Sequence, residues 1–354
     1  MNLLLVSVKS KISIGGIATW TDRFLERCGV HGINCYLVNT EVIGTRAEQS
    51  TARRRLSDEF VRTRKIFKDL IFFLKTEKLD VAHLNTSCGN FGLFRDYLIA
   101  LLIRKKNIPL ATHYHCDIPY WVTNPFSRKC LGALARLSNY NLVLCESSRE
   151  FLEKNYGIQS QKIPNFVEES LILEFQKKVR DKIERIFYAG RITKEKGVAE
   201  LYELAKRFPE IQFDLAGEVA QEVDNWEKPE NVSLLGIIPR KEIIERLDCS
   251  DLFVFPSYSE GFSLSLLESM ARGVPAIATD VGANADMLNN DRGIVIPQGN
   301  IEEMEAAILL LEDSEKRRTI SENAMKWVRT QCVTDVVLTE LKQMYLCTCN
   351  GNTV

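Results

Sequence analysis

Residues 251–275 read DLFVFPSYSEGFSLSLLESMARGVP, and this stretch carries the clearest structural pattern in the chain. Residues 251–255 are typical of a buried strand, and residues 256–260 predict a loop. A helix is expected over residues 263–271, because the glycine and proline that follow are helix stop signals. A strand, a loop and a helix in this order form one step of an α/β fold.

The same step recurs along the whole chain. Further apolar runs lie at residues 3–7, 34–38, 81–85, 109–114 and 141–145 in the first half, and at 185–189, 212–216, 232–235, 276–279 and 293–296 in the second. Helical patterns separate them, which predicts parallel sheets covered on both faces. At 354 residues the chain exceeds the size of one ordinary domain. We therefore predict two Rossmann-like α/β domains that face each other across a cleft.

The charged stretch 168–185 contains no strand pattern and marks the domain boundary. We expect one α/β domain over residues 1–165 and a second over residues 166–330. Residues 301–328 have a helical period, and after a break near Thr330 residues 331–354 are expected to form a C-terminal helix able to return to the first domain.

Composition excludes several classes of protein. The chain is 45% hydrophobic and 26% charged, and its opening has neither the apolar length nor the cleavage site of a signal peptide. No apolar run is long enough to span a membrane, so we expect a cytoplasmic chain. The ten cysteines have irregular spacings, which argues against a zinc site or a disulfide framework.

Charge is distributed unevenly between the two halves. Residues 1–165 contain 24 Lys and Arg against 14 Asp and Glu, a balance of +10, and the remainder contains 22 against 33, a balance of −11. This asymmetry suggests that the first half faces something anionic. Nothing resembles a nucleic-acid-binding motif, so no nucleic-acid partner is expected.

The segment from Arg46 to Lys78 contains ten Lys and Arg and five Asp and Glu, interleaved with bulky apolar residues. Such a helix can lie on an anionic membrane surface, which would place the protein peripherally on the inner face of the cell membrane. It can equally cover a sheet and expose a solvated basic back. Both interpretations remain open.

Two carboxylates flank the start of the predicted helix at 263–271. If the interval from Glu260 to Glu268 were helical throughout, eight steps would separate the Cα atoms by roughly 12 Å, whereas paired glycosidase carboxylates need about 5–9.5 Å. The spacing therefore favours two separate polar contacts. The alternative is that Glu260 caps the helix and Glu268 is solvated. The helix N-terminus also offers backbone N–H groups of Gly261, Phe262 and Ser263 to hydroxyls or anions.

This stretch resembles the E-x7-E pattern of the retaining glycosyltransferases of family 4, which have the GT-B fold. The resemblance implies that Glu268 holds the ribose hydroxyls of a nucleotide-sugar donor and that Glu260 lies by the transferred sugar. It implies a UDP-linked donor as the commonest case, a saccharide or lipid-linked saccharide acceptor, and neither a bound metal nor another cofactor. It also implies that residues 166–330 bind the nucleotide sugar and residues 1–165 bind the acceptor.

A second element, YAGRITKEKG, occupies residues 188–197. Arg191 and Lys196 project from a loop that follows a predicted strand, where two cations can clamp a diphosphate and offset its growing charge. An ordinary charged loop is the alternative. The element resembles the family's GRxxxxKG pattern, which assigns both side chains to the donor pyrophosphate.

Three further residues are candidates on weaker patterns. Gly16 follows the first strand in a double glycine, and the family's equivalent loop faces the donor phosphate. In HYHCD at residues 113–117, the resemblance places His115 near the sugar, whereas His113 is expected to pack in the core. Gly282 matches the family's glycine-rich turn, but the second glycine of that turn is Ala283 here.

The resemblance implies a retaining hexosyltransferase of polysaccharide, capsule or lipopolysaccharide synthesis. Arg191, Lys196, Glu260 and His115 are the expected catalytic residues. The alternatives are a GT-B nucleotide-sugar epimerase and a non-catalytic nucleotide-sugar-binding partner of another transferase.

Overall fold

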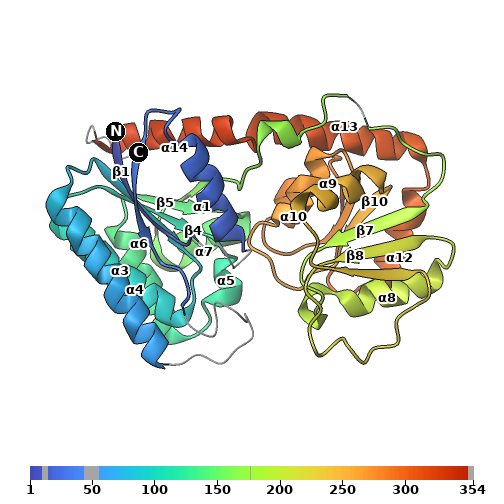
Figure 1. Ribbon diagram of the computed structural model, residues 1–354, viewed down its shortest axis with the longest axis horizontal. Coiled ribbons are helices and arrows are strands. Elements are labelled where there is room, and N and C mark those ends of the chain that lie inside the picture. Colours follow the sequence, from blue (N-terminus) through green and yellow to red (C-terminus); the bar gives the residue numbers. More distant parts are fainter. Residues whose placement is uncertain (10–14, 44–55, 176, 350–354) are drawn as a thin grey trace. The chain divides into compact units, whose positions relative to one another are not determined.

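The computed structural model describes residues 1–9, 15–43, 56–175 and 177–349, and the chain folds as two compact units (Figure 1). Unit 1 consists of Met1–Asn165 and Thr334–Val354, and unit 2 consists of Phe166–Val333. The chain therefore leaves unit 1 once and returns to it with its last helix.

Unit 1 is built on a six-stranded sheet with the order β2-β1-β3-β4-β5-β6. All of its pairings are parallel. The strands are β1 Asn2–Ser7, β2 Asn34–Asn39, β3 Val81–Thr86, β4 Leu110–Tyr114, β5 Tyr140–Val143 and β6 Gln161–Lys162. Because β1 pairs with both β2 and β3, the strand order reverses beside β1, and open α/β sheets bind ligands at such a point.

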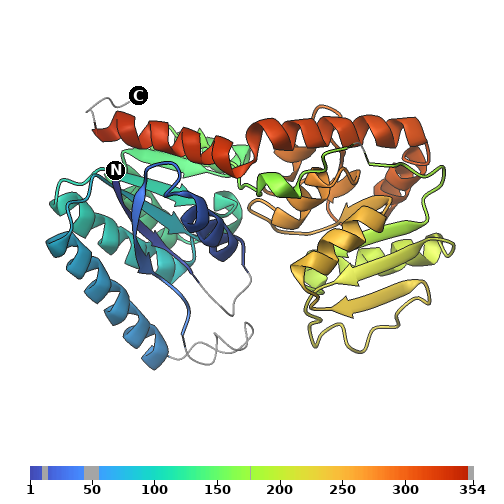
Figure 2. The ribbon, with the colours of Figure 1, turned by 45° about the horizontal axis from the view of Figure 1, so that its top comes forward.

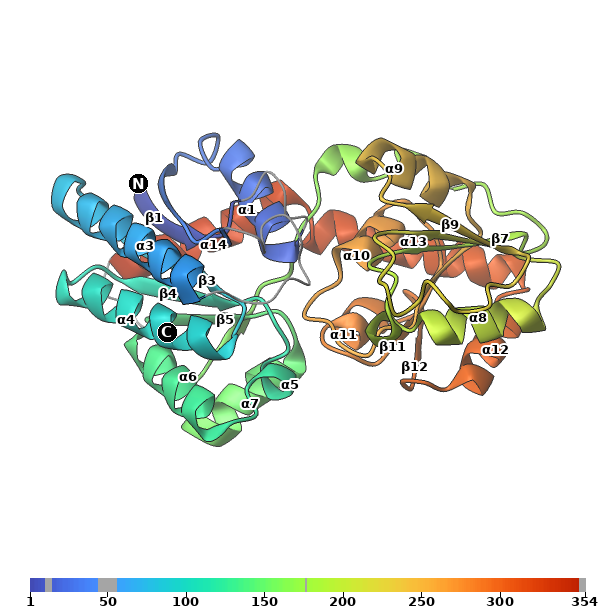
Figure 3. The same cartoon turned by 60° about the horizontal axis from the view of Figure 1, so that its bottom comes forward.

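Helices cover both faces of this sheet. They are α1 Gly16–Arg27, α3 Leu56–Thr76, α4 Asn90–Lys105, α5 Ile118–Trp121, α6 Pro125–Leu137, α7 Glu146–Tyr156 and α14 Thr334–Cys349. Helix α4 packs between α3 and α6, whereas α1 packs against α14. Figure 3 shows α3, α4 and α6 in front of the sheet and α14 behind it. The core between these helices and the sheet includes Leu70 of α3, Leu93 of α4 and Leu131 of α6.

Unit 2 has a second parallel six-stranded sheet with the order β12-β11-β10-β7-β8-β9. The strands are β7 Arg185–Ala189, β8 Gln212–Ala216, β9 Val232–Gly236, β10 Leu252–Phe255, β11 Ala276–Thr279 and β12 Ile294–Ile296. Counted from its own first strand, the order is that of dinucleotide-binding domains, 3-2-1-4-5-6. The order reverses between β7 and β10, which places the loops after these two strands at the expected ligand position.

The helices of unit 2 again form two layers, visible on either side of the sheet in Figure 2. They are η1 Glu169–Leu171, η2 Lys194–Lys196, α8 Val198–Arg207, α9 Arg240–Cys249, α10 Leu264–Ala271, α11 Asn284–Leu288, α12 Ile301–Leu310 and α13 Ser314–Gln331. Helix α8 packs against α12, and α10 packs against α13.

The α/β fold class predicted from the sequence is confirmed, with two Rossmann-like units. Strands occur at each expected apolar run, but β6 was not predicted, because its two residues are both exposed and have no apolar pattern. The continuous helix expected over 301–328 was wrong. Asp313 interrupts it, because its carboxylate accepts the backbone N–H of Glu315 at 2.9 Å and so starts α13 as a new helix. The next break lies at residues 332–333, near Thr330 as expected.

Within the described ranges, no helix combines the length and the apolar character that a membrane span requires.

The last helix is joined to unit 1 by buried and half-buried polar contacts. The hydroxyl of Tyr345 lies 2.6 Å from Nδ1 of His83, and both side chains are fully buried. Nearer the start of α14, Asp335 accepts two hydrogen bonds from Arg27 at 2.9 Å and lies 3.0 Å from His31. Helix α14 is thus an integral part of unit 1.

Replacement of Tyr345 by Phe is expected to destabilise unit 1 by about 1–3 kcal/mol, because Nδ1 of His83 would stay buried without a donor. Urea denaturation at neutral pH measures this loss. Tyr156→Phe is the matched control, since the Tyr156 hydroxyl donates to the exposed Arg128 carbonyl at 2.9 Å, where water can replace it. Equal losses in the two variants would contradict the assignment.

Candidate functional site

The loop after β10 ends on a capped helix. Ser263 is the N-cap of α10, and its hydroxyl accepts the backbone N–H of Leu266 at 3.2 Å. In the part of the chain that the structure describes, the backbone N–H groups of Gly261 and Ser263 have no acceptor. These two groups fit the expected role of the loop in binding hydroxyls or anions.

Lys196 and Glu260 form an ion pair within unit 2. Nζ of Lys196 lies 2.5 Å from Oε1 of Glu260, and each side chain is 14% exposed. The same Nζ donates to the Ser259 carbonyl at 2.8 Å and to Oγ of Ser257 at 3.3 Å. The Ser257 hydroxyl in turn donates to Oε1 of Glu260 at 2.9 Å. The expected carboxylate and the expected cation therefore share one polar cluster.

This cluster changes the part expected of Lys196. An ammonium group has three donors, and Lys196 directs them at three protein acceptors. A direct hydrogen bond to a diphosphate would require one of these contacts to be exchanged. In the arrangement observed, Lys196 supplies positive charge and fixes the orientation of Glu260.

Arg191 differs from Lys196 although both lie in the loop after β7. Its side chain is exposed and has no carboxylate partner among the described residues. Its backbone carbonyl is held by the hydroxyl of Tyr188 at 2.8 Å. The guanidinium therefore keeps all of its donors for an incoming anion.

Two glycines allow the loops of unit 2 to approach each other. Gly197 has a φ of +76°, and a Cβ there would lie 2.2 Å from the Pro256 carbonyl oxygen. Gly282 has a φ of +55°, and a Cβ there would lie 2.3 Å from the carbonyl oxygen of Glu260. Neither position tolerates a side chain. Close packing against the Glu260 loop thus explains why residue 282 is glycine, without any contact between Gly282 and a nucleotide sugar.

Ala283, the departure from the family's turn, uses its amide inside the protein. Its N–H donates to the Gly261 carbonyl at 2.9 Å. This amide is therefore not available to a ligand, and it fixes the loop after β10 from the other side.

Glu268 lies on α10 in a different cationic setting from Glu260. Its carboxylate is 3.6 Å from Nη2 of Arg240, and its side chain is 13% exposed. Arg240 also makes a bidentate pair with Glu168 at 2.9 and 2.5 Å. The two glutamates thus serve separate contacts, as their spacing predicts. Sequence reasoning missed Arg240, and the only available signal was the helix start at Pro239.

In unit 1, His115 lies directly after β4 in an aromatic cluster. Its ring centroid is 4.0 Å from that of His113, and the Trp20 ring lies 5.5 Å away. His83 stacks on the same indole at 5.3 Å. His113 is fully buried, in agreement with its expected place in the core.

A chain of hydrogen bonds orients the amide of Asn85. The Thr21 hydroxyl donates to the Ile17 carbonyl at 2.8 Å, so its oxygen accepts the Ser7 hydroxyl at 2.6 Å. Because the Ser7 proton is then used, Oγ of Ser7 accepts from Nδ2 of Asn85 at 2.9 Å. The network therefore directs Oδ1 of Asn85 toward the histidines.

This orientation determines the tautomers of two histidines. Oδ1 of Asn85 accepts from Nε2 of His83 at 2.9 Å and from Nε2 of His115 at 3.0 Å. Both rings then carry their proton on Nε2 and leave Nδ1 as an acceptor. Nδ1 of His83 receives the Tyr345 hydroxyl, whereas Nδ1 of His115 is buried and has no partner among the described residues. His115 thus offers a neutral acceptor nitrogen.

Burial keeps these rings uncharged. It lowers the pKa of His83 to about 4 and, with the neighbouring His83 as a second cause, the pKa of His115 to about 3. A charged imidazolium is thereby excluded at neutral pH.

Gly16, the remaining residue predicted in unit 1, is the first residue of α1, and Gly15 is its N-cap with a φ of −140°. Open space surrounds the position of a Cβ on either glycine. Neither backbone geometry nor packing therefore requires glycine here.

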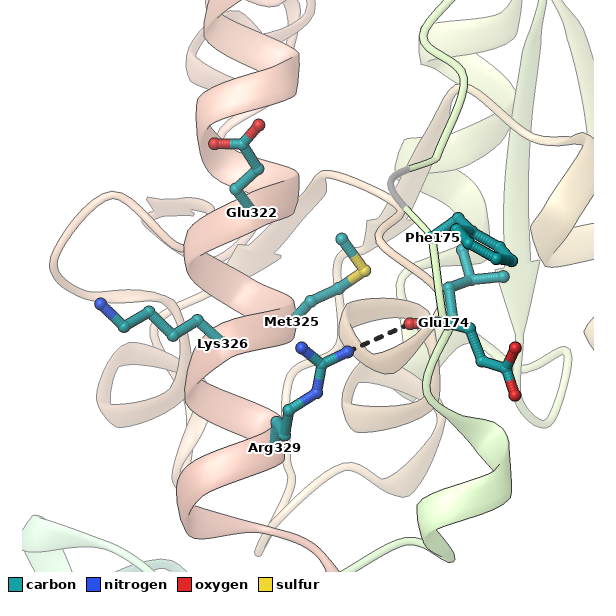
Figure 4. A pocket seen from close by; sticks show the side chains of 7 residues that line it. Glu174, Phe175, Glu322, Met325, Lys326 and Arg329 are labelled. Carbon is teal, nitrogen blue, oxygen red and sulfur yellow. Dashed lines mark hydrogen bonds between the residues drawn. The ribbon is translucent and has the colours of Figure 1, made fainter.

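A hollow elsewhere on unit 2 contains none of the predicted residues. Figure 4 shows it between α13 and the segment that includes the exposed Phe175, with Met325 and Arg329 directed into it. Arg329 donates to the Leu173 carbonyl at 3.1 Å. We assign this hollow no part in the site. Over the described ranges, no three His, Cys, Asp or Glu side chains are grouped to hold a metal ion.

Two models of known protein families match adjoining parts of the chain. The model described as "Glycosyltransferase Family 4" matches residues 14–171, and that described as "Glycosyl transferases group 1" matches residues 171–327. The chain belongs to this family of glycosyltransferases, which has the GT-B fold.

Individual relatives are more distant. The capsular polysaccharide biosynthesis glycosyltransferase CapM of Staphylococcus aureus is 28% identical over 171 residues, 45% of each chain. The chain spans about half the length of the first curated relatives it matches.

Two solved structures have the same fold over nearly the whole chain. The sucrose-phosphate synthase of Thermosynechococcus elongatus has a TM-score of 0.80 at 17% identity and covers 99% of this chain and 100% of its own. Anabaena HepE in complex with UDP and glucose has a TM-score of 0.71 at 15% identity, covering 97% of this chain and 99% of its own.

The ion pair of Lys196 and Glu260 leads to a prediction about stability. Lys196→Met and Glu260→Gln should each destabilise unit 2, because each leaves a partly buried group without its partner. The free energy of unfolding of the double variant should fall by about 1–3 kcal/mol less than the sum of the losses in the two single variants. Chemical denaturation of all four proteins measures this coupling.

The exposed pair Lys154–Glu150, at 2.6 Å, is the control for this cycle and should show no measurable coupling. Additivity in the Lys196–Glu260 cycle would mean that the two side chains do not act as a pair.

The buried histidines predict a loss of stability in acid. The unfolded state binds a proton on His115 near pH 6.5, whereas the folded state does so only near pH 3. Stability is therefore fully present above pH 6.5 and decreases below it, by about 2 kcal/mol per histidine at about pH 5. Urea denaturation above pH 6.5 and at about pH 5 tests this. The free energy of unfolding of His115→Asn is expected to depend less steeply on pH. Identical slopes for the two proteins would disprove it.

Proposed function

We propose that this chain transfers a hexosyl group, with retention of anomeric configuration, from a UDP-linked sugar to a saccharide or lipid-linked saccharide acceptor. The proposal rests on the polar cluster formed by Lys196, Glu260 and Ser257. It also rests on Arg191, which has no carboxylate partner among the described residues. The cluster and Arg191 occupy the loops after β7 and β10, where strand order reverses in unit 2. The Anabaena structure with UDP and glucose supports the choice of donor.

In this proposal the charges of unit 2 act on the departing diphosphate. Arg191 hydrogen-bonds its oxygens, and Lys196 adds positive charge while it holds Glu260 toward the sugar. Glu268, oriented by Arg240, accepts the ribose hydroxyls. The backbone N–H groups of Gly261 and Ser263 complete the donor contacts. Phe262 and Gly282 shape the loop that presents them.

His115 and Gly16 contribute from unit 1. Nδ1 of His115, which the protein covers in this structure, becomes accessible in the proposal and accepts a sugar hydroxyl, because the ring stays neutral and Nε2–H is held by Asn85. Gly16 leaves room for the donor phosphate. The bond from the anomeric carbon to the diphosphate breaks as the acceptor oxygen attacks from the same face. The acceptor's proton passes to the departing diphosphate, so no covalent nucleophile is needed.

The proposed role is assembly of a cell-surface polysaccharide of the capsule or lipopolysaccharide type. The name of the Staphylococcus aureus relative, which refers to capsular polysaccharide biosynthesis, supports it. No metal or other cofactor is proposed.

A binding screen followed by kinetics tests the proposal. UDP and UDP-sugars should raise the melting temperature, because a ligand of the native state stabilises it. With the donor that binds, Arg191→Ala should lower kcat by about 10²–10³-fold. Lys194→Ala is the matched control, since this lysine is exposed in the same loop, and it should change kcat little.

Other outcomes have defined meanings. Conversion of a UDP-sugar to its epimer without an acceptor would replace the proposal by an epimerase. Donor binding without turnover on any acceptor, unchanged by Arg191→Ala, would indicate a non-catalytic partner and would disprove the assigned roles.

A further inference from the structure

The outward face of α3 carries apolar and cationic side chains together. Residues 44–55, which include Arg46 and the arginines at 53–55, lie outside the described residues, so the helix is considered from residue 57. Ile66 and Leu70 are buried and serve the core. The exposed apolar residues are Phe60, Val61, Ile71 and Phe72, and the exposed cations are Arg64, Lys65, Lys68 and Lys75.

The same character continues on α4 and α6. Phe91 and Phe94 of α4 are 74% and 43% exposed, and Phe126 of α6 is 54% exposed. The rings of Phe94 and Phe126 lie 5.8 Å apart. Nδ2 of Asn124 donates to Oδ1 of Asn90 at 2.9 Å and ties the starts of the two helices together. The apolar residues thus belong to one layer, shown from the front in Figure 3. We call this surface the α3–α4–α6 face.

The exposed charged residues of this part of the chain have a single sign. Between residues 57 and 137, the seven Asp and Glu residues are all buried or half-buried. The exposed charged residues in this range are Arg64, Lys65, Lys68, Lys75, Lys78, Lys105, Lys106, Arg128, Lys129 and Arg136. By contrast, α12 in unit 2 exposes Glu302 and Glu303 on the same helix as its exposed Leu309 and Leu310.

Four exposed phenylalanines gather at one end of the face, whereas Phe72 lies toward the other end of α3. Phe60 lies near the start of α3, Phe91 and Phe94 near the start of α4, and Phe126 near the start of α6. A helix that follows a strand of a parallel sheet begins at the carboxyl edge of that sheet. This is also the edge at which His115 follows β4. These four phenylalanines therefore lie toward the same end of unit 1 as His115.

We propose that the α3–α4–α6 face binds the surface of an anionic lipid bilayer, with the aromatic side chains inserted among the headgroups. The cations attract the anionic headgroups, and the aromatic rings gain by leaving water. A second copy of this chain fits less well, because a two-fold contact would set the exposed cations of α3 against those of the partner copy. The proposal is independent of the transfer reaction, because binding to lipid needs neither donor nor acceptor.

Vesicle co-sedimentation of the full chain tests the proposal. The probes are vesicles of phosphatidylcholine alone and of phosphatidylcholine mixed with phosphatidylglycerol. Binding is expected only to the mixed vesicles, and it should weaken as salt is added. Lys65→Gln with Lys68→Gln should reduce the partition coefficient by about fivefold for each cation removed. Phe91→Ser with Phe126→Ser should reduce it by about tenfold for each ring.

Leu309→Ser with Leu310→Ser is the matched control, because it removes two exposed apolar side chains from unit 2. This variant should bind as the parent protein does. Circular dichroism and thermal melting check that each variant is folded. If the double phenylalanine variant fails, Phe60→Ser replaces it, because it removes one exposed ring at the same end of the face.

A fluorescence measurement reports on insertion directly. In Phe126→Trp the added indole emission should shift to shorter wavelength with mixed vesicles, whereas Leu309→Trp should show no shift. Absence of binding to mixed vesicles at low salt would overturn the proposal. So would binding that the phenylalanine substitutions leave unchanged, because the face would then be a general polyanion site. Self-association through this face in sedimentation velocity would also overturn it.

Discussion

Parallel pairing of every strand in both sheets is the constraint on which the site depends. A chain that leaves one parallel strand must cross back along the sheet before it enters the next, so the following loops meet at one edge. In unit 2 this brings Lys196, after β7, against Glu260, after β10, although 64 positions separate them. In unit 1 it places Gly16 and His115 at a common edge.

Satisfaction of buried polar groups then decides which side chains remain available. The three donors of Lys196 are held by Glu260, Ser259 and Ser257, so the lysine orients a carboxylate while the nearby Arg191 keeps its donors. In unit 1 a series of hydrogen bonds orients the Asn85 amide, which accepts from Nε2 of His115 and leaves Nδ1 of that ring without a partner among the described residues. The same family motif thus contains cations with different tasks, which a pattern of residue types does not distinguish.

Much of the fold was predictable because buried strands of parallel sheets are short apolar runs. Strand β6 was not predicted, because its exposed edge residues have no such run. The division between α12 and α13 was not predicted either, because one capping side chain, Asp313, starts a new helix within a continuous helical period. The basic segment of α3 was visible from composition alone. Its continuation onto α4 and α6 was not, because Phe94 and Phe126 become neighbours only when the helices pack.

By itself, the sequence determined that the chain forms two parallel α/β sheets and that a motif with two glutamates, an arginine and a lysine follows strands of the second sheet. It did so because strand and helix periods and turn residues are local properties. Only the tertiary structure decided the strand order, the ion pair of Lys196 with Glu260, the contact of Arg240 with Glu268 and the tautomer of His115. Each of these depends on atoms brought together from distant positions, and hydrogen bonds act only over about 3 Å.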